Sequence, residues 1–181
     1  MEIILIRHGK PTSADNPIIA AAEYTRWIRR YNFSDIAKDS RPEKVNDKYK
    51  SFYIVSSDLK RAVHSANIYV EKSPEATDKL YREMEIPRYK LPFQLTAWHW
   101  VCLSRFLWMI GCKGSFESFK EAKQRAELAT KQLIEIAQQQ GKVVLFGHGY
   151  MNRYIRKSLI HQGWDLKSKS NAYWGVTNLV R

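Results

Sequence analysis

Cysteine is scarce in this sequence. Its two cysteines, Cys102 and Cys112, lie in one apolar segment and lack the spacing of metal ligands. Their number and placement argue against a disulfide framework and favour a reducing compartment. We therefore predict two buried free thiols and no metal centre.

Targeting and membrane-spanning segments are also lacking. Residues 1–3 contain no basic region, and the apolar run over residues 3–6 is too short for the core of a signal peptide. The other apolar run, residues 101–110, has about half the length of a membrane span and contains Arg105. We therefore expect a cytoplasmic protein that is neither exported nor inserted into a membrane.

Acidic residues are few compared with basic ones. The chain has 30 Lys and Arg against 18 Asp and Glu, which gives a formal net charge of +12. Such a surplus attracts an anionic partner: a nucleic acid, a membrane surface or a phosphorylated molecule. The basic residues are dispersed, without a nucleic-acid-binding motif or a continuous basic helix face. We therefore expect neither nucleic acid nor a membrane as partner, and the sequence does not predict the oligomeric state.

Hydrophobic patterning indicates an α/β fold. Apolar runs bounded by polar turns predict parallel strands over residues 3–6, 52–55 and 143–146. A weaker alternation over residues 173–180 predicts an edge strand. Strands of this kind, separated by helical segments, predict one domain over residues 1–181. We expect a three-layer α/β/α architecture with a mostly parallel central sheet and an antiparallel edge strand.

The helical segments follow the strands. Helical spacing occurs over residues 17–31, and Ser57-Asp58 can cap a helix that runs to about residue 70. Ser115 can cap a long helix with one apolar stripe, which Gly141 ends before the next strand. Helices in these positions would cover both faces of the sheet.

The segment from about 87 to 114 interrupts this pattern. It is crowded with aromatic residues, among them Trp98, Trp100 and Trp108, and we interpret it as an insertion. One hypothesis is a helix packed on the core. The other is a lid that contacts substrate.

Residues with chemical potential follow each predicted strand. His8 comes just after the first strand, Arg61 a few residues after the second, and His148 just after the third. Ligands of α/β proteins bind beyond the carboxyl ends of parallel strands. We therefore expect these three side chains to meet at one edge of the sheet.

These residue types suit the binding and transfer of a phosphoryl group. Arg7 and Arg61 can grip phosphate oxygens bidentately, and the helix start near Arg61 favours an anion as well. A neutral imidazole can attack phosphorus and form a labile phosphoramidate. His148, which is flanked by glycines, could donate to the phosphate when protonated.

The chain resembles the histidine phosphatase superfamily, the phosphoglycerate mutase-like group that contains cofactor-independent phosphatases and phosphoglycerate mutases. The resemblance extends from residue 3 to about residue 153. Four segments carry it: Leu5-Ile6-Arg7-His8-Gly9, Ser56-Ser57-Asp58-Leu59-Lys60-Arg61-Ala62, Glu83 within Tyr81-Arg82-Glu83-Met84-Glu85, and Phe146-Gly147-His148-Gly149.

The resemblance implies a role for each matching residue. His8 would be the nucleophile that becomes phosphorylated, and Arg7, Arg61 and His148 would hold the phosphoryl oxygens. Glu83 would protonate the leaving group, which is needed because an alkoxide leaves poorly. Glu85, two residues further on, is the rival for this role.

Several neighbours are candidates for a supporting role around the phosphate. They are Gly9, Ser13, His64 and Gly149. Ser13 and His64 could equally be a turn residue and a helix-surface residue. His64 lies one helical turn beyond Arg61 and is the better candidate of the two.

We therefore predict a metal-independent, cofactor-independent phosphatase that cleaves a phosphomonoester or a phosphoramidate through phosphohistidine. The alternatives are mutase-like phosphoryl transfer and a phosphate-binding module with little turnover. The Lys10-Pro11-Thr12-Ser13 segment lacks the Trp-Asn pair usual in mutases, which puts transfer in doubt. A small phosphorylated substrate is favoured and a phosphoprotein is the alternative. The substrate itself is not predicted.

Overall fold

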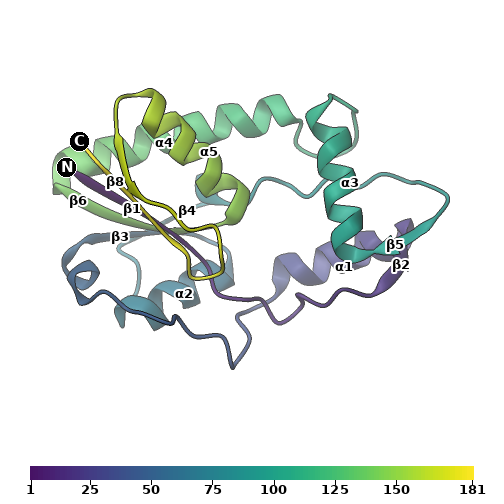
Figure 1. The fold of residues 1–181 in the computed structure, drawn as a ribbon, viewed down its shortest axis with the longest axis horizontal. Helices are drawn as coiled ribbons and strands as arrows, with labels where there is room; N and C mark the ends of the chain where they lie inside the picture. The colour runs from purple at the N-terminus through teal and green to yellow at the C-terminus, as the bar shows by residue number, and fades with distance from the viewer.

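The computed structural model describes residues 1–181 and is built on a six-stranded sheet of order β4-β3-β6-β1-β8-β7 (Figure 1). Parallel pairing joins β4, β3, β6 and β1, and antiparallel pairing joins β1 to β8 and β8 to β7. The strands are β1 (Glu2–Arg7), β3 (Tyr53–Ser57), β4 (Ala76–Asp78), β6 (Lys142–Gly147), β7 (Asp165–Ser168) and β8 (Val176–Val180).

Helices cover both faces of this sheet. They are α2 (Lys60–Val70) on one face, and α4 (Phe119–Gln140) and α5 (Gly149–His161) on the other (Figure 1). Side chains alternate along β1, so that Ile3 and Leu5 pack with α4 and α5 while Ile4 and Ile6 pack with α2. The predicted three-layer α/β fold with a mostly parallel sheet and an antiparallel edge is confirmed.

The edge strand differs from the one predicted. The alternating segment near the C-terminus forms β8, which lies between β1 and β7 and is therefore not at the edge. The antiparallel edge is β7, all four residues of which are exposed, and the opposite edge is the parallel strand β4. A strand with no buried face carries no alternation in its sequence, so the pattern could not reveal it.

Two predicted helix caps are wrong, and two predicted helix ends are confirmed: α2 ends at Val70 and α4 ends before Gly141. Helix α4 begins after Ser118, whose hydroxyl accepts a hydrogen bond from the Glu121 N–H, and not after Ser115. Helix α2 begins after Leu59 without a side-chain cap, because the Ser57 hydroxyl accepts from the Leu59 N–H before the first turn. Gly141 ends α4 with a positive φ of 76°, which glycine adopts without strain.

Two short 3-10 helices, η1 (Asp47–Ser51) and η2 (Lys79–Tyr81), pack against the sheet domain's core. The other four elements form a lobe beside the sheet, which we call the α1–α3 lobe. It consists of β2 (Ile18–Ala20), α1 (Ala21–Phe33), β5 (Gln94–Thr96) and α3 (Ala97–Met109) (Figure 1). Strands β2 and β5 pair with each other, and the lobe has a core of its own that includes Tyr24, Trp27 and Trp100. The segment that we interpreted as an insertion thus packs with α1.

The two cysteines lie on the surface. Cys102 and Cys112 are exposed free thiols, so the prediction that they are buried is wrong. Cys102 belongs to α3, a helix that buries only the face turned toward α1 and the sheet.

None of the helices combines the length and the apolar character that a membrane crossing requires.

Candidate functional site

The carboxyl ends of three neighbouring parallel strands bring His8, Arg61 and His148 together. His8 follows β1, His148 follows β6, and Arg61 lies in the first turn of α2, after β3. All three side chains are buried, with exposures of 1%, 0% and 0%. The two imidazole rings lie 5.0 Å apart between centroids, and Arg61 Nε lies 3.3 Å from His8 Nε2.

The tautomer of His8 follows from its backbone contact. His8 Nδ1 lies 2.7 Å from the Gly9 carbonyl oxygen, which can only accept, so Nδ1 carries the proton. The lone pair is therefore on Nε2, which faces Arg61. Burial lowers the pKa of His8 well below 6.5, and the charges of Arg61 and Arg7 lower it further. His8 is thus held as a neutral imidazole whose Nε2 lone pair points at Arg61 Nε.

The end of α1 orients Arg61. Arg61 Nη1 donates to the carbonyl oxygens of Tyr31, at 3.3 Å, and Asn32, at 2.9 Å. Helix carbonyls at a C-terminus lack intrahelical partners and carry partial negative charge, which suits a guanidinium. The α1–α3 lobe therefore orients an arginine of α2, a helix that packs on the sheet. No motif in the sequence indicates this contact.

Arg7 is held by the loop before β8. Its Nη1 donates to the Asn171 carbonyl oxygen at 2.8 Å, and its Cζ lies 4.2 Å from the centre of the Tyr173 ring. Tyr173 also faces His8, with ring centroids 5.8 Å apart. Tyr173 and Asn171 could not be identified from the sequence, because they come from an irregular segment without apolar spacing or a recognisable motif.

Four buried nitrogen atoms in this cluster have no hydrogen-bond partner within the protein. They are Arg7 Nε, Arg61 Nη2 and both ring nitrogens of His148. Buried polar groups are nearly always paired. The two arginine nitrogens and one ring nitrogen of a neutral His148 carry a proton, so this group marks a place where an anion would accept from several donors at once. Burial lowers the pKa of His148 well below 6.5, and Arg61 and His8 lower it further.

Glu83 lies at the start of α5, beside this cluster. Its carboxylate accepts hydrogen bonds from the N–H groups of Tyr150 (3.2 Å), Met151 (3.0 Å) and Met84 (3.0 Å). A Cβ atom built on Gly149 would lie 3.4 Å from Arg7 Nε and 3.7 Å from Glu83 Oε2. Gly149 therefore separates the cation from the carboxylate, and its lack of a side chain keeps the space between them open.

Two arginines fasten the loop that carries Glu83. Arg125 of α4 donates to the carbonyl oxygens of Arg82, at 2.7 Å, and Glu83, at 3.3 Å. Arg82 forms two 2.7 Å hydrogen bonds with Asp58, just before α2, and this contact lowers the pKa of Asp58. The Arg82–Asp58 contact thereby connects the loop that carries Glu83 to the start of α2, which carries Arg61.

The rival carboxylate has other partners. Glu85 accepts from the Glu117 N–H at 2.6 Å and pairs with Arg88 at 3.3 Å. The segment around Glu83 and Glu85 is not a strand, so the two side chains need not share a face. Glu83 therefore lies against the cluster and Glu85 toward α4.

The structure separates the candidates for a supporting role. The Gly9 N–H donates to Ser65 at 3.0 Å, and a Cβ on Gly9 would lie 2.4 Å from Trp174, so only glycine fits beside His8. His64 is exposed and lies 2.6 Å from Asp35, between Nδ1 and Oδ1. Ser13 lies in a turn. His64 thus lies on the helix surface and Ser13 in a turn, which were the alternatives to a supporting role.

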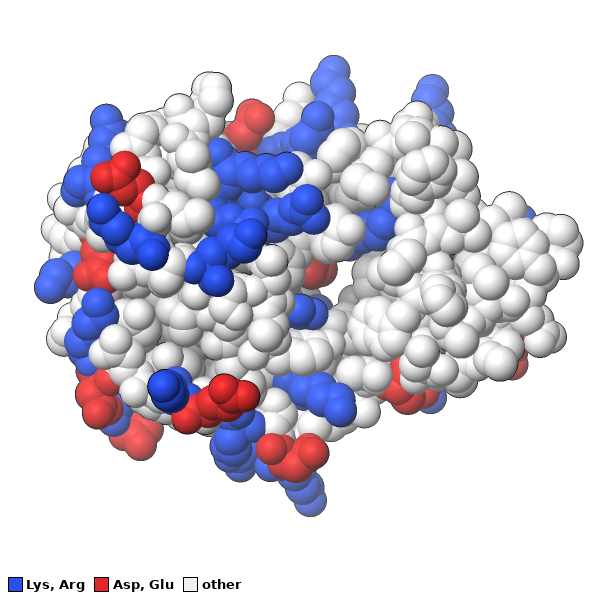
Figure 2. All heavy atoms as spheres, in the orientation of Figure 1, with Lys and Arg blue, Asp and Glu red and all other residues white.

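A cavity of about 240 Å³ opens beside Arg7 and Glu83, between α3 and α5, and we call it the α3–α5 cavity. Figure 2 shows a hollow between the sheet body and the α1–α3 lobe, with basic side chains along its sheet-side rim. The segment that we interpreted as an insertion contributes Trp98, Val101 and Arg105 to the lining. The other lining residues are Arg7, Tyr31, Glu83, Ile86, Gly149, Tyr150, Arg153 and Asn171.

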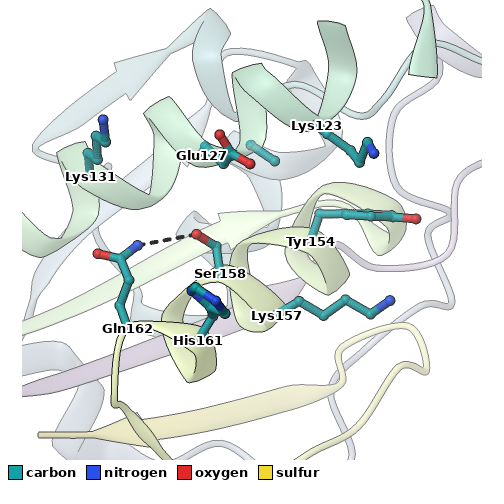
Figure 3. A pocket seen from close by; sticks show the side chains of 9 residues that line it. Lys123, Glu127, Lys131, Tyr154, Lys157, Ser158, His161 and Gln162 are labelled. Carbon is teal, nitrogen blue, oxygen red and sulfur yellow. Dashed lines mark hydrogen bonds between the residues drawn. The ribbon is translucent and has the colours of Figure 1, made fainter. Parts of the chain in front are cut away.

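A second groove, of about 480 Å³, lies between α4 and α5 and contains none of the predicted site residues (Figure 3). Lys123, Lys131 and Lys157 line it, and the closest polar contact drawn there joins Gln162 to Ser158 at 3.2 Å. These lysines are exposed and solvated. The structure contains no cluster of three His, Cys, Asp or Glu side chains able to hold a metal ion.

The buried histidines predict how stability depends on pH. His8 and His148 bind protons more weakly in the folded chain than in the unfolded chain, where their pKa is near 6.5. Unfolding therefore takes up protons below this pH, and stability falls as the pH is lowered, by at most about 1.4 kcal/mol per pH unit for each group. Urea unfolding at pH 7 and pH 5 measures this loss.

The matched variants are His148→Gln and His161→Gln. We expect His148→Gln to reduce the loss of stability between the two pH values. His161 is exposed at the end of α5, and its replacement should leave the loss as it is in the wild type. An equal loss in all three proteins would contradict the assigned state of His148.

Comparisons with known proteins agree with this architecture. The family model described as histidine phosphatase superfamily (branch 1) matches residues 42–179. No curated protein matches the chain by sequence.

Solved structures with a similar fold include three enzymes. One is a phosphoserine phosphatase of Entamoeba histolytica, with 14% identity, a TM-score of 0.54, and coverage of 99% of this chain and 90% of that one. Another is the alpha-ribazole phosphatase of Shigella flexneri, with 18% identity, a TM-score of 0.53, and coverage of 88% and 80%. The third is a mycobacterial glucosyl-3-phosphoglycerate phosphatase, with 14% identity, a TM-score of 0.54, and coverage of 88% and 82%.

Proposed function

We propose that this chain, which belongs to the histidine phosphatase superfamily (branch 1), hydrolyses a small phosphomonoester through a phosphohistidine on His8. One observation carries the proposal. The unpartnered buried nitrogens of Arg7, Arg61 and His148 gather around a histidine whose Nε2 carries the lone pair, toward which Arg61 Nε points. A tetrahedral dianion would accept from several of these groups while its phosphorus faces Nε2.

The first chemical step transfers the phosphoryl group to the protein. His8 Nε2 attacks phosphorus, the phosphorus–oxygen ester bond breaks, and the leaving oxygen takes a proton from Glu83. Arg7 and Arg61 neutralise the charge on the phosphoryl oxygens in the transition state. The Gly9 carbonyl, which accepts from Nδ1, stabilises the positive charge that the ring acquires.

The second step releases inorganic phosphate. The Glu83 carboxylate takes a proton from a water molecule, whose oxygen attacks phosphorus, and the phosphorus–nitrogen bond breaks. His8 regains its neutral form and Glu83 is again protonated. Because the same carboxyl serves as acid and then as base, each turnover restores the starting state.

Access to His8 requires local movement. Its side chain is 1% exposed, and Arg61 Nε occupies the direction of the Nε2 lone pair. A phosphoryl group reaches Nε2 only if the Arg61 donor turns from the histidine to a phosphate oxygen and the covering side chains shift. Tyr173, whose ring centroid lies 5.8 Å from that of His8, is one side chain that could move in this way.

A turnover assay on small phosphomonoesters, with a chelator present, tests the proposed function. The proposal assigns charge neutralisation to arginines, so phosphate release should continue undiminished in chelator. The panel contains phosphosugars, phosphoamino acids, nucleotides and a phosphohistidine peptide. If the protein bound phosphate tightly but released no phosphate from any of these substrates, the phosphate-binding module would be favoured instead.

Arg61→Lys is expected to lower kcat/KM by about 100-fold, because lysine keeps the charge and loses both the planar fork and the two anchoring carbonyls. The measurement is steady-state kinetics on the best substrate of the panel. Arg29→Lys, an exposed position on α1, is the matched control and should stay within about twofold of wild type. Equal activity of the two variants would contradict the role of Arg61.

A further inference from the structure

A buried arginine of α5 has no carboxylate as its partner. Arg156 is 8% exposed, and none of the salt bridges in the protein involves it. Its Nη1 atom donates to the side-chain oxygen of Asn171 at 3.2 Å. Burial lowers the pKa of Arg156, and the charge of Arg153 lowers it further. A buried cation that is paired only with a neutral amide costs stability, which points to a functional role.

Asn171 joins this arginine to the phosphate cluster. Its backbone carbonyl oxygen accepts from Arg7 Nη1 at 2.8 Å, while its side-chain oxygen accepts from Arg156. Asn171 is exposed and lies outside every helix and strand, and these two arginines are its only hydrogen-bond partners. Apart from Arg7 itself, Arg156 is therefore the only residue that ties Asn171 to the body of the protein by a hydrogen bond.

The position of Asn171 decides where the Arg7 guanidinium points. One face of this group lies over the Tyr173 ring, and its Nη1 is tied to Asn171. Because a guanidinium is planar, a fixed face and a fixed Nη1 together set the direction of its other N–H groups. The buried and unpartnered Nε is thereby held beside Gly149. If Tyr173 shifts to admit a substrate, the contact with Asn171 is the one that keeps this direction.

Helix α5 contacts the residues of both roles in the proposed chemistry. The N–H groups of Tyr150 and Met151, in its first turn, donate to the carboxylate of Glu83. Arg156 lies less than two turns further along the same helix. A helix is rigid over this length, so one element sets the acid and, through Asn171, the direction of the phosphate-binding arginine.

We propose that Arg156 is a positioning residue for phosphoryl transfer, which fixes the Arg7 guanidinium through Asn171 and so aligns it with Glu83. The proposal rests on the proposed function for the role of Arg7. Arg156 does not line the α3–α5 cavity, and it acts only through Asn171, which in turn acts through Arg7. Each of these residues should therefore lose its effect once the next one is removed.

Steady-state kinetics on Arg156→Met and Asn171→Ala test the first contact. Methionine keeps an apolar stem in the buried position and loses the donor, whereas alanine keeps the backbone carbonyl and loses the side-chain oxygen. We expect each variant to lower kcat/KM by about tenfold, and the double variant to lose no more than either one. Arg156→Lys keeps a donor and should lose less. Activity of Asn171→Ala within about twofold of wild type would overturn the proposal.

Lys157→Met is the matched control for the lost charge. Lys157 is the next residue of α5, is exposed, and lines the groove between α4 and α5 instead of the site. Its replacement should leave kcat/KM within about twofold of wild type. Equal losses in Arg156→Met and Lys157→Met would mean that the positive charge of the helix, and not the contact with Asn171, is responsible, and would overturn the proposal.

The Arg7→Met background separates positioning from a structural role. In this background Arg156→Met and Asn171→Ala should change kcat/KM by less than about twofold, because the guanidinium that they position is gone. A structural role would lower kcat/KM by the same factor in both backgrounds, and that result would overturn the proposal. If Arg156→Met does not fold, Asn171→Ala decides in the same two backgrounds.

Phosphate binding separates this proposal from the proposed function. If wild type releases phosphate from no ester, the proposed function fails, and calorimetry with inorganic phosphate on the same variants takes the place of kinetics. Weaker phosphate binding in Arg156→Met and Asn171→Ala, with no further weakening in the Arg7→Met background, supports the positioning role. Unchanged binding in both variants, or no phosphate binding by wild type, rejects it.

Discussion

Replacement of His8 by alanine is expected to lower kcat/KM for any phosphomonoester that this protein hydrolyses by about 10⁴-fold or more, since it removes the group that attacks phosphorus. The Gly9 carbonyl oxygen fixes the tautomer of the His8 ring, so that its lone pair is on Nε2. The arginines remain in this variant, so substrate binding should persist while phosphate release stops. Steady-state kinetics and equilibrium binding on the same protein measure both.

His161→Ala is the matched control for that experiment. His161 is exposed at the end of α5 opposite to the one that contacts Glu83, and its loss should leave kcat/KM within about twofold. Substantial phosphate release by His8→Ala, in a protein shown to be free of contaminating phosphatase, would mean that another group attacks phosphorus.

Glu83→Gln is expected to have an effect that depends on the leaving group. For an alkyl phosphate, kcat should fall by about 10³-fold, because the departing alkoxide loses its proton donor. For p-nitrophenyl phosphate the first step alone, followed as the pre-steady-state burst of nitrophenolate, should slow by less than about tenfold, because a nitrophenolate leaves without help. The comparison of the two substrates in one variant measures protonation of the leaving oxygen directly.

Glu85→Gln distinguishes the two carboxylates. Glu85 accepts from the Glu117 N–H and pairs with Arg88, so its replacement should loosen the loop and affect both substrates slightly and equally. A larger and leaving-group-dependent loss in Glu85→Gln than in Glu83→Gln would assign the acid to Glu85 and contradict the proposed mechanism.

The convergence of His8, Arg61 and His148 could be predicted from the sequence because it depends only on strand order. Each residue follows a strand that reads as a continuous apolar run, and parallel strands place their carboxyl ends at one edge. Local patterns therefore sufficed to place the three side chains together, without knowledge of how the helices pack.

Other parts of the site depend on contacts between distant segments. Arg61 is oriented by backbone carbonyls of Tyr31 and Asn32, and backbone atoms carry no sequence signature. Tyr173 lies near His8 from an irregular loop, and Arg105 lines the cavity only because α3 packs in the α1–α3 lobe. Tertiary packing decides each of these positions, and no local pattern encodes it.

The incorrect predictions have local causes. Ser115 and Ser118 both precede the apolar stripe of α4, and Ser118 caps the helix because Glu121 completes the reciprocal hydrogen bond three residues later. Cys102 lies in an apolar helix, yet its side of the helix meets no other element. Composition alone does not distinguish the two faces of such a helix.

The account stands on a covalent bond between phosphorus and His8 Nε2, and rapid quenching of the enzyme during turnover of a phosphorus-labelled substrate tests for it most directly. We predict an acid-labile, base-stable label on the peptide that contains His8. The label should be absent from His8→Ala. A wild-type enzyme that turns over without acquiring label, or that carries it on any other residue, would contradict the account.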